Sequence, residues 1–494
     1  MLFNSFEFLL FFPIVTILFF VIPRKVRYLW LLVASYYFYM CWNVKYVVLL
    51  LFSTLITWGL GLILPKISSK SSRKLVMLTG LFTNLAVLFF FKYFNFFYSN
   101  LGRVLGKVGI TLADSPFDFL LPVGISFYIF QALGYLIDVY REEIQPEKNV
   151  LRYALFVSFF PQLVAGPIER SGRLLTQIQR MEEIVVFEGK RIEEGLVLML
   201  WGLFQKMVIA DRIAIFVDNI FGNLQGIGTI ETVLAAIGFS LQIYCDFAGY
   251  SNIAIGAAKV MGFELMENFN TPYFATNIAD FWRRWHISLS TWFRDYLYIP
   301  LGGNRKGRLR KYLNLMITFL VSGLWHGSNW TYILWGGIHG LYQIVGDFIR
   351  PWKEKVYKAC KVKTEAESFR LGQILVTFLL TSFAWIFFRS TSLSKAVLYV
   401  KRMFTHFNPW VLFDQSLFNW GLDRIEVDVL MPALILLFLV EWIRYRKKET
   451  IGQFLVRQNT WFYWGGLILL ILSILVFGEY GVLFDSKQFV YFAF

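Results

Sequence analysis

Charged side chains are scarce in this sequence, at 16% of 494 residues, against about 25% in an ordinary soluble domain. Their scarcity argues against a soluble multidomain protein, a disordered chain, a coiled coil and a collagen-like fibre. Hydrophobic residues make up 57% of the chain and aromatic residues 19%, and the mean hydropathy is +0.55. The composition therefore predicts a polytopic membrane protein.

Cysteine and histidine are also rare. The three cysteines lie far apart and form no CxxC pair, so neither a disulfide framework nor a zinc knuckle is predicted. No GxSxG elbow, P-loop or HExxH pair occurs, which argues against a serine hydrolase of the α/β type, a P-loop ATP pump and a metalloprotease-like centre. We expect no metal site. The four histidines are His286, His326, His339 and His406.

Long apolar runs dominate what is present, and a membrane span needs about 20 such residues. The apolar content suffices for about ten spans or more. The runs cover Phe6–Ile22, Tyr28–Trp42, Tyr46–Leu64, Leu75–Phe97, Leu196–Ile209, Ile230–Ile255, Tyr312–Leu324, Trp330–Val345, Ile374–Phe388, Val429–Trp442 and Trp461–Phe477.

The basic residues predict the orientation of these spans. The net charge of +15 would indicate nucleic acid in a soluble protein, but in a membrane protein Lys and Arg collect in cytoplasmic loops. No basic region precedes the first run, so we expect a first span with an external N-terminus rather than a cleaved signal peptide. Placing every basic cluster in the cytoplasm makes both termini external. The clusters are Arg24–Arg27, Lys66–Lys74, Arg305–Lys311, Lys353–Lys363 and Arg444–Lys448.

The middle of the chain differs from its flanks. Between residues 117 and 345, Pro, Gly and charged residues interrupt the apolar pattern, as in Leu121–Gly124, Phe160–Gln162 and Ala165–Arg170. Non-helical backbone survives at membrane depth only when it is buried in protein or lines a wet cavity. We therefore expect one membrane-embedded domain over residues 1–494, with N-terminal spans in 1–116, a functional core in 117–345 and C-terminal spans in 346–494.

Two stretches of this core combine polar groups with aromatic residues. Asp280–Tyr296 mixes Arg, Asp, His and Ser with Trp and Phe, which is typical of an intramembrane site or of an interfacial amphipathic helix. In Ser322–Trp330, His326 lies between two apolar runs with a glycine on either side, and it is either a packed residue or a general base. His339 follows thirteen residues later and, on an unbroken helix, would face another way. We expect His406 to be structural.

One carboxylate lies in an otherwise uncharged run. Asp246 stands within Gln242–Ser251, where an ion-coupled transporter would use such a group. The alternative is a hydrogen bond between helices.

Several separated motifs resemble hallmarks of the membrane-bound O-acyltransferase (MBOAT) family, and the similarity is greatest to its alginate and polysaccharide O-acetyltransferase branch. It extends over most of the chain. The motifs are Phe159–Ile168, Gln242–Ser251, Phe281–Asp295 and Trp325–Gly327, together with Leu2–Ser5 and Phe489–Phe492.

The resemblance implies an all-α membrane protein whose helices surround a central tunnel, with broken or re-entrant helices in the core. A thioester donor would enter from the cytoplasm and an acceptor hydroxyl would approach from outside. The family's catalytic histidine corresponds to His326, the expected general base, and a second histidine corresponds to His286, which would orient the acceptor or polarise the thioester. Arg283 and Arg284 would attract donor phosphates or else extend toward the membrane interface.

The favoured hypothesis is an acetyltransferase of the cell membrane that modifies an extracellular polysaccharide. Its donor would be acetyl-CoA, with no permanently bound cofactor. Its partners would be the lipid bilayer, the glycan and an extracellular enzyme that relays acetyl groups, but no nucleic acid. The first alternative is D-alanyl transfer to teichoic acid from a carrier-protein thioester. The second is an ion-coupled transporter that uses Asp246.

Overall fold

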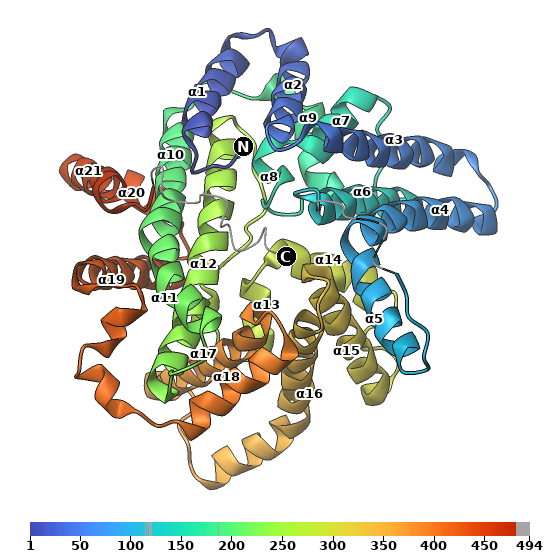
Figure 1. Cartoon of the computed structure of the whole chain (residues 1–494). Coiled ribbons are helices and arrows are strands. Elements are labelled where there is room, and N and C mark those ends of the chain that lie inside the picture. The colour runs from blue at the N-terminus through green and yellow to red at the C-terminus, as the bar shows by residue number, and fades with distance from the viewer. Residues whose placement is uncertain (114, 116, 118–120, 186, 481–494) are drawn as a thin grey trace. The chain divides into compact units, whose positions relative to one another are not determined.

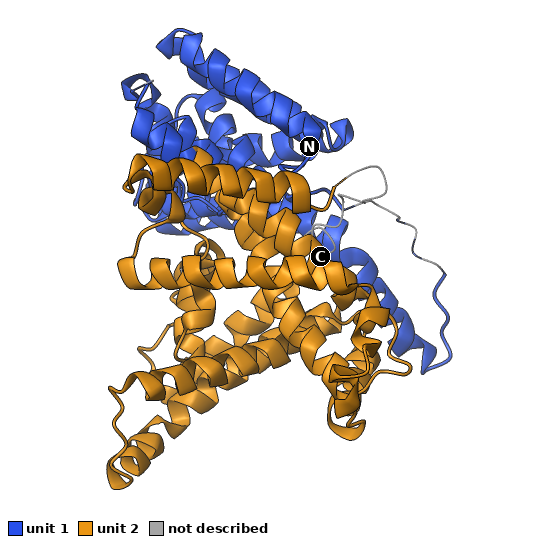
Figure 2. Ribbon diagram, turned by 90° about the vertical axis from the view of Figure 1, so that its left-hand side faces the viewer, with its two compact units in different colours: residues 1–195, 254–266 blue, residues 196–253, 267–494 orange. Residues whose placement is uncertain are grey.

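The computed structural model describes residues 1–113, 115, 117, 121–185 and 187–480. Every regular element in these ranges is a helix (Figure 1), which confirms the predicted all-α class. Contacts divide the chain into two compact units (Figure 2). Unit 1 comprises Met1–Gly195 and Ala254–Met266, and unit 2 comprises Leu196–Ile253 and Glu267–Phe494. The helices α10 (Gly189–Leu203) and α12 (Thr229–Val260) each contribute to both units. The expected divisions at residues 116 and 345 stay a prediction.

Unit 1 is built mainly from its first nine α-helices. Its short 3₁₀ and π segments are η1 (Arg24–Val26), η2 (Val44–Tyr46), η3 (Leu64–Lys66), η4 (Phe89–Tyr93), η5 (Ser171–Leu175) and η6 (Met181–Glu183). The α-helices are α1 (Phe6–Val21), α2 (Arg27–Met40), α3 (Val47–Ile63), α4 (Lys70–Leu88), α5 (Phe94–Gly106), α6 (Ile125–Tyr140), α7 (Val150–Ser158), α8 (Phe160–Leu163) and α9 (Thr176–Gln179).

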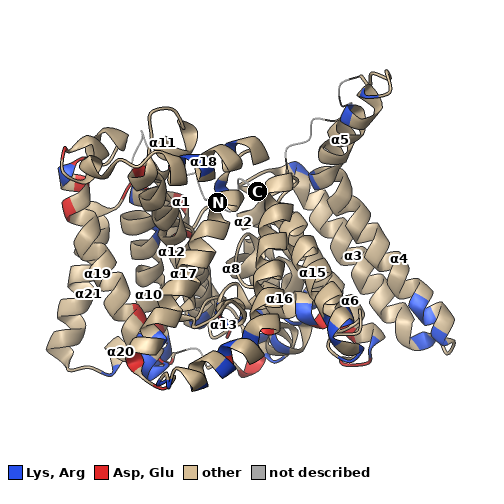
Figure 3. Ribbon diagram, turned by 90° about the horizontal axis from the view of Figure 1, so that it is seen from below, with Lys and Arg blue, Asp and Glu red and all other residues tan. Residues whose placement is uncertain are grey.

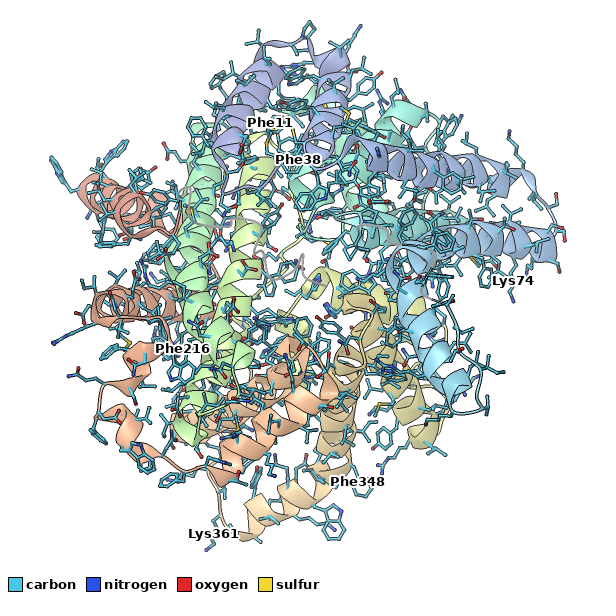
Figure 4. The ribbon with its side chains drawn as sticks, in the orientation of Figure 1. Phe11, Phe38, Lys74, Phe216, Phe348 and Lys361 are labelled. Atoms are coloured by element: carbon cyan, nitrogen blue, oxygen red, sulfur yellow. The ribbon has the colours of Figure 1, made fainter. Side chains whose placement is uncertain are left out.

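The core of unit 1 is aromatic and centres on a fully enclosed helix. Fifteen of the sixteen residues of α6 are buried, as expected of a helix that is apolar on all sides. Phe11 on α1 and Phe38 on α2 point toward each other in Figure 4, with ring centroids 5.8 Å apart. The outer helices expose apolar side chains instead, as spans facing lipid must.

The interruption of the apolar pattern at Phe160–Gln162 lies beside a helix break in unit 1: α7 ends at Ser158, and Phe160–Gln162 belong to the short helix α8. The chain turns at Phe159 between α7 and α8, and the backbone N–H of Phe160 donates to Ser35 Oγ at 3.1 Å. The carbonyl oxygen of Phe156 accepts from the side-chain amides of Gln131, at 2.6 Å, and Gln162, at 2.8 Å. The motif therefore supplies the hydrogen bonds that a break in a buried helix would otherwise lose.

Unit 2 contains the remaining helices. Its 3₁₀ and π segments are η7 (Phe204–Ala210), η8 (Pro272–Phe274), η9 (Arg294–Tyr298), η10 (Pro409–Leu412) and η11 (Ser416–Trp420). Its α-helices, besides parts of α10 and α12, are α11 (Asp211–Gly222), α13 (Ile278–Arg284), α14 (Ile287–Phe293), α15 (Gly307–His326), α16 (Trp330–Ala359), α17 (Glu367–Arg389), α18 (Leu393–Thr405), α19 (Arg424–Lys447), α20 (Ile451–Val456) and α21 (Thr460–Phe477).

A buried ionic cluster joins the long helices of unit 2. Lys206, in the π segment η7, lies 2.6 Å from Asp211 and 2.7 Å from Asp246 on α12. A charge buried without a partner would be strongly destabilising, whereas the paired arrangement is tolerated. Asp246 therefore forms an ion pair between helices. The contact agrees with the expected polar bond between helices, with Lys206 as the partner, and the transporter role of Asp246 stays untested.

All eleven apolar runs fall on helices, and within the part of the chain that the structure describes five helices are long and apolar enough to cross a membrane by length and composition. The count of about ten spans stays a prediction, because it would need shorter or more polar helices such as α1, α2, α15, α16 and α19.

In Figure 3, α18 and α20 lie at opposite ends of α19. Lys and Arg gather near α20, where the sequence predicts the cytoplasm. The five spans are Val44–Lys66, Lys70–Gly106, Thr229–Val260, Glu367–Arg389 and Thr460–Phe477.

Candidate active site

Unit 2 brings His286 and His326 together, although forty residues separate them in the sequence. Their ring centroids are 6.3 Å apart, and the two residues are 1% and 4% exposed. His286 lies at the junction of α13 and α14, and His326 is the last residue of α15. The two histidines that the resemblance singled out therefore share one buried site.

The hairpin of α15 and α16 positions His326. A Cβ at Gly323 would overlap the carbonyl oxygen of Tyr332, and one at Gly336 would overlap that of Phe319. Gly323 and Gly336 therefore allow α15 and α16 to approach closely, and α16 continues without a break at Gly336. Asn329 caps α16 by accepting from the Thr331 N–H at 3.1 Å, so the turn after His326 is fixed as well.

A hydrogen-bond network orients His286. Its backbone is in the left-handed region, with φ +43°, and its Nδ1 lies 3.0 Å from Asn268 Oδ1. The same amide oxygen accepts from Ser288 Oγ at 2.9 Å, and Asn268 Nδ2 donates to Ser251 Oγ at 3.2 Å. Because an amide oxygen only accepts, Nδ1 carries the proton and Nε2 of the neutral ring is the acceptor nitrogen. Burial lowers the pKa of His286 to about 3, which favours this neutral form.

Aromatic rings enclose His326. Trp325, Trp335 and Phe388 place their ring centroids 5.0, 5.1 and 5.4 Å from the imidazole. Trp335 also stacks on Trp385 at 5.4 Å. Walls of this kind exclude water and strengthen electrostatic interactions inside the site.

The aromatic residues of Asp280–Tyr296 belong to this core. Phe281, Trp282, Trp285 and Trp292 are buried, so the stretch is not an interfacial amphipathic helix. It forms two seven-residue helices that break at His286.

The other two histidines lie apart from the pair. His339 is buried on α16, where its Nδ1 accepts from Trp282 Nε1 at 3.2 Å. No hydrogen-bond partner of its Nε2 occurs among the described residues. His406 is exposed in the segment after α18, and its backbone oxygen accepts from the Thr229 N–H at 2.9 Å. No group of three metal-ligating side chains occurs within the described ranges.

A large cavity extends along the same helices, and we name it the basic cavity. Its volume is 1710 Å³, and α13 to α17 line it. On α15 its lining runs from Lys311 to Ser322, one helical turn before His326. Its basic side chains are Arg283, Arg294, Lys311, Arg350 and Lys353.

The neighbouring arginines of the aromatic motif have different roles. Arg283 is exposed and lines the basic cavity. Arg284 pairs with Asp280 at 3.0 Å and donates to Thr271 Oγ1 at 3.1 Å. Of these two arginines, only Arg283 is therefore placed to meet an anionic ligand in the basic cavity.

The sequence did not single out Asn268 or Lys206, and it included Ser251 only as the last residue of the motif Gln242–Ser251, although all three form polar contacts inside unit 2. Asn268 stands in an irregular segment, where no periodicity marks one polar residue above another. Lys206 had a detectable signal, since it is one cation within the apolar run Leu196–Ile209. Its partners, by contrast, depend on tertiary packing.

Comparison with known proteins places the chain in a family. The sequence profile of the MBOAT, membrane-bound O-acyltransferase family matches residues 38–388. The chain is 40% identical over 443 residues to the probable alginate O-acetylase AlgI of Pseudomonas putida, covering 88% of this chain and 86% of the relative. It is 37% identical over 402 residues to the peptidoglycan O-acetyltransferase of Helicobacter pylori, covering 76% and 73%.

A more distant relative carries the name of the first alternative activity, D-alanyl transfer to teichoic acid. The teichoic acid D-alanyltransferase of Bacillus subtilis is 29% identical over 256 residues, covering 49% of this chain and 62% of the relative.

Of the motifs that carried the resemblance, Phe489–Phe492 lies outside the described residues. The profile match and the long alignments show that the chain belongs to the membrane-bound O-acyltransferase family and is an O-acyltransferase enzyme.

Proposed function

We propose that this enzyme moves an acetyl group from a cytoplasmic thioester, acetyl-CoA, to a hydroxyl of an extracytoplasmic polysaccharide, with His326 as the general base. The observation that carries the proposal is the buried His286–His326 pair, 6.3 Å apart, one helical turn beyond the basic cavity. The names of the alginate and peptidoglycan relatives support a glycan acceptor.

The transfer needs one proton carrier. His326 takes the proton of the attacking hydroxyl while its oxygen bonds to the thioester carbonyl carbon. The carbon–sulfur bond of the tetrahedral intermediate then breaks, and the thiolate leaves with the proton that His326 returns. His326 ends α15, and the partial negative charge at a helix C-terminus favours the transient imidazolium.

His286 has a narrower role than the two expected from the resemblance. With the proton on Nδ1, its Nε2 accepts rather than donates. The neutral ring therefore orients the attacking hydroxyl and does not polarise the thioester carbonyl. We assign the developing oxyanion to the indole N–H of Trp335, which is buried beside His326 and has no hydrogen-bond partner among the described residues.

The basic cavity has the chemistry of a donor site. Lys311 and Lys353 belong to two of the clusters predicted to be cytoplasmic. Lys311 is paired with Asp347 at 2.7 Å, so Lys353 and Arg283 are the side chains that would attract the phosphate groups of CoA. From Lys311 to His326 the helical rise spans about 22 Å. A donor that binds its phosphates at the basic end would extend its thioester arm along α15 toward the histidines.

A transfer assay in proteoliposomes tests the proposal. Acetyl-CoA with a labelled acetyl group is supplied, and CoA release and label on the glycan are followed for the wild type and for His326→Ala. Label transfer that requires His326 would support the proposal. Equal transfer by His326→Ala would overturn the assignment of the base. Transfer from a D-alanyl carrier protein in place of acetyl-CoA would favour the teichoic acid hypothesis.

The same assay separates direct from relayed transfer. The first acceptor is either the glycan or an extracytoplasmic enzyme that passes the acetyl group on. Label that reaches the glycan without added protein would establish direct transfer. Label that requires a partner protein would establish the relay.

A further inference from the structure

A second concave surface in unit 2 lies away from the histidines. It has a volume of 640 Å³ and lies between residues 226–231 and residues 402–420. We name it the loop groove. Its size is within the range of small-ligand sites, about 300–1,000 Å³.

The floor of the loop groove is held rigidly. Glu231, 3% exposed, accepts from the Gly228 N–H at 3.0 Å and from Asn408 Nδ2 at 2.6 Å. Asn408 Oδ1 in turn accepts from the Ile230 N–H at 3.1 Å. A Cβ at Gly228 would overlap the Asn408 side chain. These bonds pin the connection between α11 and α12 to the connection between α18 and α19, so the groove is formed before any ligand arrives.

The walls of the loop groove combine aromatic rings with planar polar groups. Trp410 is 59% exposed and Phe407 is 71% exposed, and Trp420, Asp414 and Asn419 also line the groove. Sugar rings present apolar C–H faces surrounded by hydroxyls. They bind where an aromatic face lies beside carboxylate and amide groups that pair with those hydroxyls. A purely lipid-facing aromatic belt would not place Asp414 and Asn419 in the same concavity.

The position of the loop groove fits the acceptor side. Residues 390–423 connect the end of α17 to the start of α19, and α17 begins just after the basic cluster that ends at Lys363. The 23 residues of α17 span about 35 Å, enough to cross a bilayer. The positive-inside rule then places the groove outside the cytoplasm.

The helix α18 connects the loop groove to the turn after His326. Asn329 Nδ2 donates to the carbonyl oxygen of Thr391 at 3.0 Å, two residues before α18 begins. The thirteen residues of α18, a rise of about 20 Å, then end at the groove. A polymer held in the groove would therefore have a neighbouring stretch near the histidines.

We propose that the loop groove binds a segment of the acceptor glycan and holds the polymer while another of its hydroxyls reaches His326. The inference rests on the proposed function, because it assigns the acceptor of the same reaction. It predicts that recognition of a polymer and its acetylation depend on different residues.

Binding is tested first, on the full chain in lipid nanodiscs. The probes are short oligosaccharides of uronic acids and of N-acetylglucosamine, followed by saturation-transfer NMR. Trp410→Ala and Asp414→Asn should each weaken binding by about tenfold, the ratio that a lost contact worth about 1.4 kcal/mol produces. Phe404→Ala is the matched control, because Phe404 is 74% exposed on α18 but does not line the groove. Binding by both groove variants at the wild-type level, or no binding by the wild type, would overturn the proposal.

Kinetics then distinguish this inference from the proposed function. Both groove variants should raise the KM for a glycan polymer and leave the KM for acetyl-CoA unchanged. Wild-type transfer with an unchanged polymer KM in both variants would overturn the groove assignment alone. Glycan binding in the groove by a wild type that transfers no acetyl group would support the groove and contradict the proposed function. If the groove variants transfer less acetyl than the wild type only when an extracytoplasmic protein is added, the groove binds that protein and not the glycan.

Discussion

The basic cavity and the loop groove both belong to unit 2, yet they present different chemistry. Regular helices line the basic cavity, which displays five basic side chains. Irregular connections line the loop groove, which displays exposed aromatic rings beside acidic and amide groups. The buried histidines lie one helical turn beyond the first and are joined to the second through α18. Under the two proposals above, donor and acceptor are recognised by separate surfaces that share one catalytic base.

The largest expected effect comes from the residue that serves both substrates. His326→Ala should lower the rate constant of transfer by a factor on the order of 10² to 10⁴, because a positioned general base contributes that much. The measurement is kcat at saturating donor and acceptor. Phe404→Ala should match the wild type. An unchanged kcat for His326→Ala would contradict the assignment of His326 as the base. The two surfaces would then have no catalytic residue in common.

A smaller loss is expected from the residue that orients His286. Asn268→Leu removes the oxygen that fixes the proton on Nδ1, and kcat should fall roughly tenfold to a hundredfold, as for other partners that orient a functional histidine. Asn268→Asp keeps an acceptor oxygen and should restore most of the rate. If both variants lose the same activity, Asn268 supports the fold and does not set the tautomer.

Substitutions in the basic cavity should change the KM for the donor and not the KM for the acceptor. The double variant Arg350→Ala and Lys353→Ala should raise the KM for acetyl-CoA about tenfold, and less so in high salt, because exposed charges are screened. The KM for the glycan should not change. Steady-state kinetics at two salt concentrations check this. A parallel rise in the glycan KM would show that the basic cavity does not serve the donor alone.

The smallest effect concerns the hairpin that holds His326. Gly336→Ala places a Cβ against the Phe319 carbonyl oxygen, and overpacking of this kind costs about 1–3 kcal/mol. The control is Gly346→Ala on the same helix, where nothing lies within 4 Å of the added Cβ. Thermal unfolding in detergent should show a lower midpoint for Gly336→Ala only. Equal midpoints would mean that the hairpin relaxes without cost.

The sequence predicted the parts of this arrangement that depend on local pattern. Apolar runs marked the helices, and Pro and Gly marked the broken core, because both signals act within a few residues of the chain. His286 and His326 were paired by family resemblance, since no periodicity relates residues on separate helices. The sequence did not predict the role of Asn268 or the loop groove, because both lie in irregular segments. There, only tertiary packing brings a side chain to its partners. The span count is not settled by composition, because buried helices are as apolar as those that face lipid.

The sidedness of transfer tests the central claim most directly. Labelled acetyl-CoA is placed on one side of sealed proteoliposomes, with glycan on the opposite side. The account predicts that label crosses to the glycan when acetyl-CoA faces the basic cavity, and that His326→Ala abolishes this transfer. Label transfer only when both substrates are on the same side of the membrane would contradict it.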